Sequence, residues 1–305
     1  MKVVYGHTDS IYVQIPMNRT EEVLDLLNTK VRKKFPNVMG LDEHPVTLEF
    51  EKYYESLGVG ITKNRNAGLI SWKDGKYLDE PEFVMTGFSA KRVAITKLAK
   101  TVQLEVLNRW VGQQSEQEIT DYLRKEYNRV LKGNLALDEV INRSRFRPER
   151  FQYKCRHCNK AYDANKMISE YKRFRGLGTE PFCSKCSNSF DLVTMQGKRP
   201  QISSGVEGVL WYNQLASIPI TDSYLYIRVS DDLSRPTYTN PITGQKKRPS
   251  YLSAPNFDEL GEINPDYKHY AESIVKKADP IYRAMGWDLK KITVDENQTT
   301  LDEWW

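Results

Sequence analysis

Strand-like spacing of hydrophobic residues dominates the first part of the chain, and two helical segments interrupt it. Two short runs rich in valine, isoleucine and tyrosine flank a Gly-His-Thr-Asp sequence and predict a β-hairpin. A Lys-Asp-Gly turn at 73–75 predicts a second hairpin. The expected strands are 3–6, 11–15, 46–54, 58–72 and 76–85, and the expected helices are 21–35 and 96–111. The pattern indicates a mixed α+β unit of about 110 residues.

Helical spacing prevails in the rest of the chain. Helices are expected at 116–131, 206–216 and 265–285, and a strand at 223–229. The segment 234–255 is rich in proline and predicts a loop. This part is therefore expected to form a second, mostly helical unit.

The composition is that of an ordinary globular protein. Of the 305 residues, 39% are hydrophobic and 28% are charged, which suits two compact units. No apolar run approaches the roughly 18 residues that a membrane span needs, so we expect a soluble, cytoplasmic protein with no membrane partner. Met1 opens directly into a strand-like run, with no sign of a signal peptide.

The charge is unevenly distributed, although the net charge is only +5. The last eleven residues are acidic and aromatic, whereas cations crowd one stretch in the middle. That stretch contains Arg143, Arg145, Arg147, Arg150, Lys154, Arg156, Lys160, Lys166, Lys172, Arg173 and Arg175. A local excess of cations predicts contact with a nucleic-acid backbone, but a solvated basic face gives the same pattern.

The tip of the first hairpin carries the most informative motif. Residues 5–10 read Tyr-Gly-His-Thr-Asp-Ser. Nucleotidyl transfer needs Mg²⁺ held by carboxylates on a rigid sheet, and a hairpin tip presents a carboxylate in that way. A single aspartate in a turn has little meaning by itself, because turns favour this residue. The flanking sequence, however, resembles motif C of family B DNA polymerases, Tyr-Gly-Asp-Thr-Asp-Ser. The resemblance aligns Asp9 with the family's principal ligand for magnesium. It places His7 where the family has its first aspartate.

The segments that follow resemble the family in the same order. Residues 48–54 resemble the palm strand after motif C, which implies a second catalytic carboxylate at Glu51; a solvated strand residue is an equal alternative. Residues 62–68 resemble the Lys-Lys-Arg-Tyr segment that grips the primer–template duplex. Lys63 and Arg65 are kept there, and asparagines replace the other two residues. The resemblance implies that both cations bind DNA phosphates, whereas the alternative is an exposed basic turn.

The resemblance continues into the second half and implies the architecture. Residues 86–103 resemble the last palm strand and the palm helix, with Arg92 as a further DNA-binding candidate. Segments at 135–145, 206–216 and 267–285 resemble parts of the thumb. The implied fold is α+β: a partial polymerase palm, built as an antiparallel sheet with helices, followed by a mostly helical thumb. The expected boundaries are 1–112 for the palm, 113–292 for the thumb with an insert at 151–190, and 293–305 for a tail.

Two other family motifs are not found in this sequence. Motif A (Asp-x-x-Ser-Leu-Tyr-Pro) supplies the other essential aspartate, and motif B (Lys-x-x-x-Asn-Ser-x-Tyr-Gly) supplies the lysine that meets the triphosphate. No exonuclease segment is found either. The chain thus resembles the small, C-terminal subunit of the split family B polymerases of archaea and their viruses. The expected partner is a large subunit that carries motifs A and B and the exonuclease.

Four cysteines form two Cys-x-x-Cys pairs inside the expected thumb. Cys155 and Cys158 are separated from Cys183 and Cys186 by 24 residues. Thiolates at this spacing close a tetrahedral Zn²⁺ site, and a complete set of four predicts a structural metal. His157 lies between the first pair and is expected to be exposed. An iron–sulfur site is the alternative.

The last eight residues resemble a clamp-binding box. Gln298, Leu301, Trp304 and Trp305 fit Gln-x-x-Leu-x-x-aromatic-aromatic, the sequence with which proteins dock on a PCNA-type sliding clamp. Such a tail inserts a one-turn apolar plug into a pocket of its partner. A tail packed on its own domain is the alternative.

These features together predict the small subunit of a heterodimeric DNA-directed DNA polymerase. Catalytic Mg²⁺ is shared with the partner chain, structural Zn²⁺ is held by the cysteines, and primer–template DNA is the substrate. The alternative is a degenerate, non-catalytic fragment that binds DNA and the clamp. His7 and Asn66, which replace family residues, favour that alternative, and the retained Asp9 and Ser10 oppose it.

Overall fold

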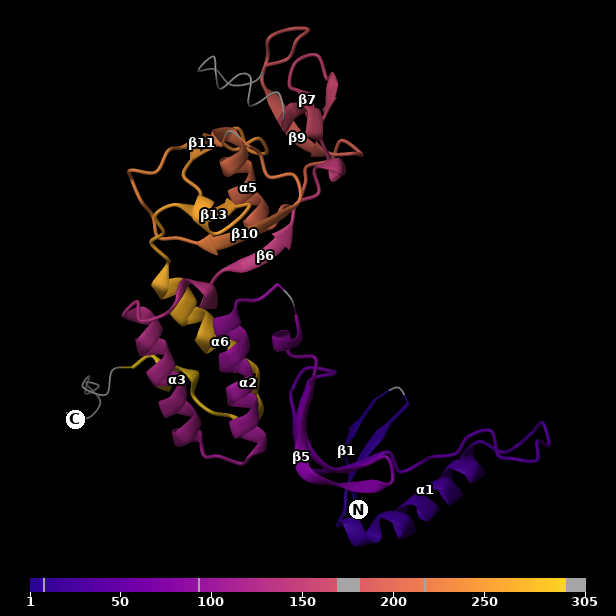
Figure 1. Ribbon diagram of the computed structural model, residues 1–305. Helices are drawn as coiled ribbons and strands as arrows, with labels where there is room; N and C mark the ends of the chain where they lie inside the picture. Colours follow the sequence, from indigo (N-terminus) through magenta and orange to yellow (C-terminus); the bar gives the residue numbers. More distant parts are fainter. Residues whose placement is uncertain (8, 93, 169–181, 217, 295–305) are drawn as a thin grey trace, which may run out of the picture. The chain divides into compact units, whose positions relative to one another are not determined.

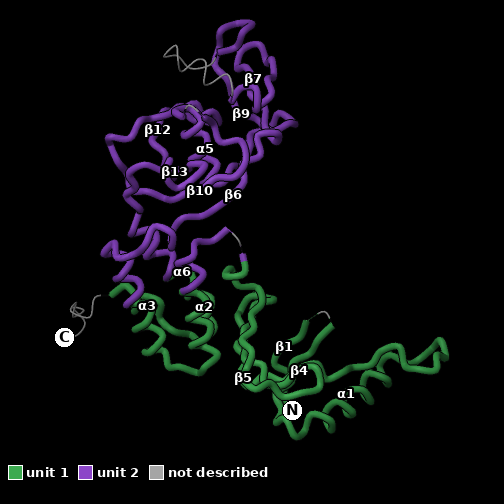
Figure 2. The backbone as a smooth tube through the Cα atoms, in the orientation of Figure 1, with its two compact units in different colours: residues 1–91, 102–124, 275–305 green, residues 92–101, 125–274 purple. Residues whose placement is uncertain are grey.

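The computed structural model describes the chain except for residues 8, 93, 169–181, 217 and 295–305. The chain divides into two compact units, each built from segments that are distant in sequence (Figure 2). Unit 1 comprises residues 1–91, 102–124 and 275–305, and unit 2 comprises 92–101 and 125–274. The palm and thumb boundaries at 112 and 292 stay predictions, because compact packing and evolutionary domains need not share boundaries.

Unit 1 begins with the predicted hairpin. Strands β1 (Lys2–Gly6) and β2 (Ile11–Gln14) pair antiparallel, with Gly6 opposite Ile11. A three-stranded antiparallel sheet follows, in the order β3 (Lys52–Val59), β4 (Asn66–Lys73), β5 (Lys76–Thr86). The second hairpin is confirmed, since Asp74 and Gly75 both have left-handed backbone angles, with φ of 52° and 82°. Two successive positive φ angles give a turn whose twist matches that of the strands it joins.

Two of the strand predictions were wrong in their boundaries. Residues 46–51 form no regular structure, because the side-chain amide of Asn28 takes the place of a neighbouring strand. Asn28 Nδ2 donates to the carbonyl oxygen of Leu48 at 3.0 Å, and the N–H of Leu48 donates to Asn28 Oδ1 at 2.8 Å. Asn28 lies in α1 (Thr20–Lys34). The expected strand 58–72 is in fact the end of β3, a loop at 60–65 and most of β4. The chain reverses there because Asn64 adopts a left-handed conformation, with φ 61°.

Three helices lie partly in unit 1. They are α2 (Lys97–Val111), α3 (Glu116–Leu131) and α6 (Tyr267–Met285). Within unit 1, the hydroxyls of Thr120 in α3 and Tyr282 in α6 lie 2.7 Å apart. The ring of Trp110 packs so closely on Gly58 of β3 that a β-carbon there would collide with it. The helical predictions for these segments are confirmed to within two residues.

Unit 2 is built on a second antiparallel sheet, in the order β13 (Tyr251–Ala254), β10 (Ser223–Arg228), β6 (Asn142–Arg145). Helix α5 (Ser204–Leu215) lies on this sheet (Figure 1). Gly208 of α5 permits the close approach, because a β-carbon there would meet the backbone oxygen of Tyr251 at 2.8 Å. The segment 234–255, expected to be a loop, instead contains β11 (Tyr238–Thr239), β12 (Lys246–Lys247) and β13.

The cysteine pairs lie at turns beside a third small sheet in unit 2, and Cys155 is the last residue of its central strand. Strand β7 (Phe151–Cys155) is central, between β8 (Ala161–Asp163) and β9 (Phe190–Thr194). The strand expected at 223–229 is confirmed as β10, but the expectation of a mostly helical second region missed the other strands from β6 to β13. These strands are short, and their hydrophobic periodicity covers too few residues to be detected in the sequence.

Several short 3₁₀ helices lie between the longer elements. They lie at Met17–Arg19, Ser89–Lys91, Leu137–Glu139, Pro148–Arg150, Asp258–Leu260 and Leu289–Ile292. Across the residues that the structure describes, the helices are too short or too polar for any of them to cross a membrane.

Candidate functional site

The tip of the β1–β2 hairpin presents Asp9 to solvent. The backbone N–H of His7 donates to the carbonyl oxygen of Ser10 at 2.8 Å and closes the turn. The Ser10 hydroxyl donates to Asp9 Oδ1 at 3.2 Å, and His7 Nδ1 lies 3.8 Å from the same oxygen. The Asp9 side chain is 86% exposed. The carboxylate is thus oriented by its neighbours and accessible to a cation.

Aromatic side chains join this hairpin to the three-stranded sheet. The rings of Tyr5 and Tyr12 lie 5.2 Å apart, and Tyr12 lies 5.9 Å from Tyr54 of β3. The Tyr53 hydroxyl donates to the carbonyl oxygen of Ile15 at 3.2 Å. Burial first, and then the nearby Tyr12 and Glu51, raise the pKa of Tyr54 well above its ordinary value, so this phenol remains protonated. A two-stranded hairpin is marginal alone, and these contacts fix it.

The structure brings the cationic loop 60–65 beside the hairpin. The backbone N–H of Gly60 donates to the carbonyl oxygen of Arg65 at 2.8 Å and closes the loop. The Tyr5 hydroxyl donates to Asn64 Oδ1 at 3.3 Å. On its other side the loop abuts Gly87, where a β-carbon would collide with the Asn64 carbonyl oxygen. Lys63 is exposed and Arg65 is half-buried at the end of this loop.

Glu51 and Arg92, the other two candidate residues, are both exposed. Glu51 precedes β3, is 65% exposed, and pairs with Lys52 Nζ at 2.6 Å. Arg92 is an exposed residue of unit 2. Over the described residues, the four cysteines form the only group of three or more side chains arranged to hold a metal. Asp9 and Glu51 are therefore not gathered with a third ligand there.

The four cysteines lie at two turns with the same internal design. In the first turn, the N–H of His157 donates to Cys155 Sγ at 3.4 Å, and in the second, the N–H of Lys185 donates to Cys183 Sγ at 3.4 Å. Each turn ends on a residue with φ 57°, Asn159 in the first and Ser187 in the second. Backbone N–H groups that point at sulfur are available to stabilise thiolates. His157 is exposed, as expected.

The sulfur positions fit one tetrahedral ion. Cys155 Sγ lies 3.4 Å from Cys186 Sγ, Cys158 Sγ lies 3.5 Å from Cys183 Sγ, and all four sulfurs lie within 4.8 Å of one another. A tetrahedral ion with metal–sulfur bonds of about 2.3 Å needs sulfurs about 3.8 Å apart. The donor set is complete, so it suits a structural metal rather than a catalytic one.

The thiols differ in acidity. A hydrogen bond from Tyr162, and then the neighbouring N–H groups, lower the pKa of Cys183 to about 6 despite its burial. The N–H of Asn188 is the main cause of a lowered pKa at Cys186. At Cys158 the N–H of Lys160 acts in the same direction, but burial and the adjacent thiols outweigh it and raise the pKa to about 11.

The cysteine turns share a hydrophobic core with the rest of unit 2. Cys155 and Cys183 are buried, at 1% and 0% exposure, in a cluster that includes Leu210 of α5 and Tyr238 of β11. The N–H of Leu192 in β9 donates to the carbonyl oxygen of Pro241 at 2.7 Å. The insert is therefore not a separate module, since α5 and the 238–247 hairpin pack directly on it.

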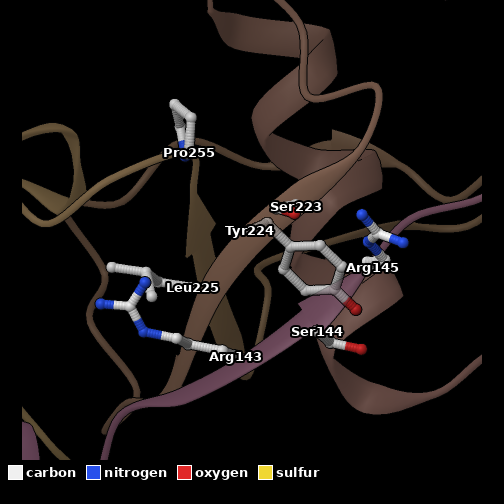
Figure 3. Close-up of a pocket in the computed structure, with 7 residues that line it drawn as sticks. All are labelled: Arg143, Ser144, Arg145, Ser223, Tyr224, Leu225 and Pro255. Atoms are coloured by element: carbon white, nitrogen blue, oxygen red, sulfur yellow. The ribbon is translucent and has the colours of Figure 1, made fainter.

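Residues of β6 and β10 line a basic hollow of about 270 Å³ (Figure 3). It is lined by Arg143, Ser144, Arg145, Ser223, Tyr224, Leu225 and Pro255. Arg143 and Arg145 are two residues apart in β6, so their side chains point to the same side of the strand, and both are exposed. Asp222 lies 3.4 Å from Arg145, whereas Arg143 has no ion-pair partner among the described residues. Part of the basic stretch is thus displayed on one sheet.

Sequence reasoning missed two side chains that support these sites. Tyr162 places its hydroxyl 3.2 Å from Cys183 Sγ, and Asn64 binds Tyr5. Neither has a sequence signal, because each acts through a contact between separate strands or loops. The clamp-box residues Gln298, Leu301, Trp304 and Trp305 lie outside the described residues, as do Lys172, Arg173 and Arg175.

Comparison with known proteins gives the family. A family model described as DNA polymerase family B matches residues 1–178. A DNA polymerase of Archaeoglobus fulgidus is 27% identical over 168 residues, which are 54% of this chain and 19% of that protein. The DNA polymerase zeta catalytic subunit of Arabidopsis thaliana is 28% identical over 141 residues, which are 46% of this chain and 7% of that protein.

The matched part therefore spans less than a fifth of either relative. The family model covers more than half of the chain, including the hairpin with Asp9, the cationic loop and the first cysteine pair. The chain belongs to DNA polymerase family B.

Proposed function

We propose that the chain is the small subunit of a heterodimeric family B DNA-directed DNA polymerase and supplies its motif C. One observation carries the proposal: the Asp9 carboxylate stands exposed on a hairpin tip, and the loop with Lys63 and Arg65 is hydrogen-bonded to that hairpin. A carboxylate for a metal and cations for phosphates are what nucleotidyl transfer to a primer requires. Both belong to unit 1.

Each residue of the hairpin has a role in this proposal. Asp9 holds catalytic Mg²⁺, which when bound polarises the reacting phosphate and stabilises the attacking and leaving oxygens. The hydroxyl of Ser10 fixes the carboxylate by its hydrogen bond to Oδ1. Lys63 and Arg65 neutralise phosphates of the primer–template duplex close to the growing end. Glu51 is proposed as an additional carboxylate that reaches the site in the assembled enzyme.

A partner chain with motifs A and B completes the site. Asp9 and Glu51 do not form a three-ligand group in the described part of the chain, so the remaining ligands come from elsewhere. The hairpin also exposes apolar side chains that a partner would cover: Val3 is 55% exposed, Val4 41% and Ile11 44%. Within the described structure, β1 and β2 pair only with each other, which leaves both edges open for another strand.

Unit 2 is proposed to hold the DNA backbone and one structural Zn²⁺. Arg143 and Arg145 point to the same side of β6. Their positions along the strand are about 7 Å apart, which is close to the spacing of successive phosphates along a nucleic-acid strand. Arg92 is a further candidate for the duplex. The sulfur separations suit a single ion better than an iron–sulfur cluster. Gln298, Leu301, Trp304 and Trp305 are proposed to bind the sliding clamp.

The test is primer extension with the chain and a partner polypeptide that carries motifs A and B from the same organism. We expect synthesis from the assembled complex and none from either chain alone. Asp9→Asn should abolish synthesis, whereas Asp74→Asn, an exposed aspartate in another hairpin turn, should leave it unchanged. Robust extension by the purified single chain would disprove the two-chain proposal.

The second candidate function is a non-catalytic module that binds DNA and the clamp. It is favoured by His7, which lies 3.8 Å from Asp9 at the position of the family's first aspartate and brings no negative charge. If the complex binds primer–template DNA but never extends it, this second function is supported.

A further inference from the structure

The two cysteine turns share the same backbone design, but only the second receives a hydrogen bond from a tyrosine hydroxyl. In each turn an N–H donates to the first sulfur at 3.4 Å, and a residue with φ 57° ends the turn. The backbone closes both turns alike: Cys155 N donates to the Lys160 oxygen, and Cys183 N to the Asn188 oxygen, each at 2.9 Å. One sulfur, Cys183 Sγ, also faces a hydroxyl, that of Tyr162 at 3.2 Å.

Tyr162 is held firmly in that position. It lies in β8 opposite Tyr153 of β7, so its backbone is fixed by strand pairing. Its ring meets Phe190 edge to face at 5.1 Å, and Lys160 Nζ lies 5.0 Å from the ring centre on the ring's face. The Ser184 hydroxyl lies 3.0 Å from the Tyr162 hydroxyl. With Ser184 as donor to Tyr162, the phenolic proton points at the sulfur.

We propose that Tyr162 is a positioning residue of the metal site, whose O–H donates to Cys183 Sγ and fixes this thiolate for a thiophilic divalent cation. The proposal rests on the metal-binding role proposed above for the four cysteines. A hydrogen bond to a charged sulfur is stronger than one between neutral groups, and it orients the ligand before the cation arrives. The proposal assigns a function to an aromatic residue that lies in neither Cys-x-x-Cys pair.

The site is asymmetric as a result. Cys183 is completely buried, and a buried thiolate needs donors to offset the loss of water. Its turn supplies backbone donors, among them the N–H of Lys185 at 3.4 Å, and Tyr162 supplies a hydroxyl donor from a separate strand. Partners that orient metal ligands contribute about 10- to 100-fold to metal affinity. Loss of this one hydroxyl should therefore weaken zinc binding about 10-fold without altering the four ligands.

The experiment compares zinc binding by the full chain and three variants. Tyr162→Phe removes the hydroxyl and keeps the ring. Tyr153→Phe is the matched control, because Tyr153 packs on the same Phe190, at 6.3 Å, from the neighbouring strand. Ser184→Ala removes the donor behind Tyr162. Affinity is measured by competition with a chromogenic chelator, and the environment of the sulfurs by the thiolate-to-metal absorption of the Co²⁺-substituted protein.

We expect about 10-fold weaker zinc binding and a shifted Co²⁺–thiolate band for Tyr162→Phe, and a change below about twofold for Tyr153→Phe. Ser184→Ala should lie between them. Affinity of Tyr162→Phe within twofold of the unchanged chain would overturn the proposal. Equal losses in Tyr162→Phe and Tyr153→Phe would also overturn it, since they indicate general destabilisation.

Failure of the metal role itself gives a different result. In that case the unchanged chain binds neither Zn²⁺ nor Co²⁺, and the role proposed for Tyr162 fails with it. If the unchanged chain binds one ion and the variants do not differ, the metal role stands and the role of Tyr162 alone is refuted. Melting temperatures of the metal-loaded proteins check that each variant is folded.

Discussion

The Asp9 hairpin and the cysteine turns both place ligand-type side chains at sharp reversals between strands, but they differ in solvation. Asp9 is 86% exposed and has two polar neighbours. The cysteines that open the two turns are buried, at 1% and 0% exposure, and receive backbone hydrogen bonds. This difference suits the roles proposed for the two sites: a site that admits a substrate has to stay open, whereas a structural metal site can be closed by its own chain.

The difference extends to the neighbourhood of each site. The hairpin is joined to the neighbouring sheet and loop by tyrosine ring contacts and by hydrogen bonds from two tyrosine hydroxyls, and several of its apolar residues are exposed. The cysteine turns share a core with α5 and β11. We therefore expect substitutions at the hairpin to change activity without unfolding, and substitutions at the cysteines to change stability first.

The largest expected effect is that of Asp9→Asn on synthesis by the assembled complex. Loss of residues that merely support metal ligands costs about 10- to 100-fold, so loss of a direct ligand should cost more than 100-fold. The melting temperature should stay within about 1 °C, because an exposed side chain contributes little to stability. Primer extension and thermal unfolding measure the two quantities. A large fall in melting temperature would remove the contrast between the two sites.

Cys183→Ser should produce the opposite pattern. We expect zinc content to fall from about one ion per chain to near zero, since a serine hydroxyl is a poor zinc ligand. Because Cys183 lies in the same core as Leu210 and Tyr238, proteolysis should cut α5 and the 238–247 hairpin as readily as the insert. Elemental analysis and limited proteolysis test this. Cuts confined to 151–190 would show that the insert is a separate module.

Removing the cations beside the hairpin should weaken DNA binding moderately. The double variant Lys63→Gln, Arg65→Gln loses two phosphate contacts, so the slope of log affinity against log salt should decrease in magnitude by about 2. Fluorescence anisotropy with a labelled primer–template at several salt concentrations gives the slope. Lys33→Gln with Lys34→Gln is the control, because these exposed cations lie in the last turn of α1. Equal changes in both variants would indicate a charge effect of unit 1 as a whole.

The smallest expected effect concerns the contact between Tyr5 and Asn64. Asn64→Gly keeps the left-handed backbone and removes the acceptor, whereas Asn64→Asp keeps both. A hydrogen bond between side chains contributes about 0.5–1 kcal/mol, so Asn64→Gly should reduce synthesis about two- to fivefold. Tyr5→Phe should reduce it by the same factor, with no further loss in the double variant. Additive losses would show that the loop and the hairpin act independently.

Much of the fold could be predicted from the sequence. The two hairpins and helices α1, α2, α3, α5 and α6 lie close to their predicted positions, because each carries enough residues to show a hydrophobic period or a turn signal. The predictions failed at 46–51, where a side-chain amide replaces strand pairing, and at 234–255, where strands of two to four residues are too short to show a period.

The amino-acid sequence alone was enough to identify the residues on which the proposed chemistry rests: the motif around Asp9, the cations at 63 and 65, and four cysteines at zinc spacing. Each is a local pattern, and the family match over residues 1–178 agrees with the polymerase resemblance. Three contacts can be seen only in the folded chain: Tyr162 faces Cys183, Asn64 joins the cationic loop to Tyr5, and α5 packs on the cysteine turns. These contacts link residues 21 to 59 positions apart or elements far apart in the chain, and such pairs leave no spacing in a sequence from which they could be read.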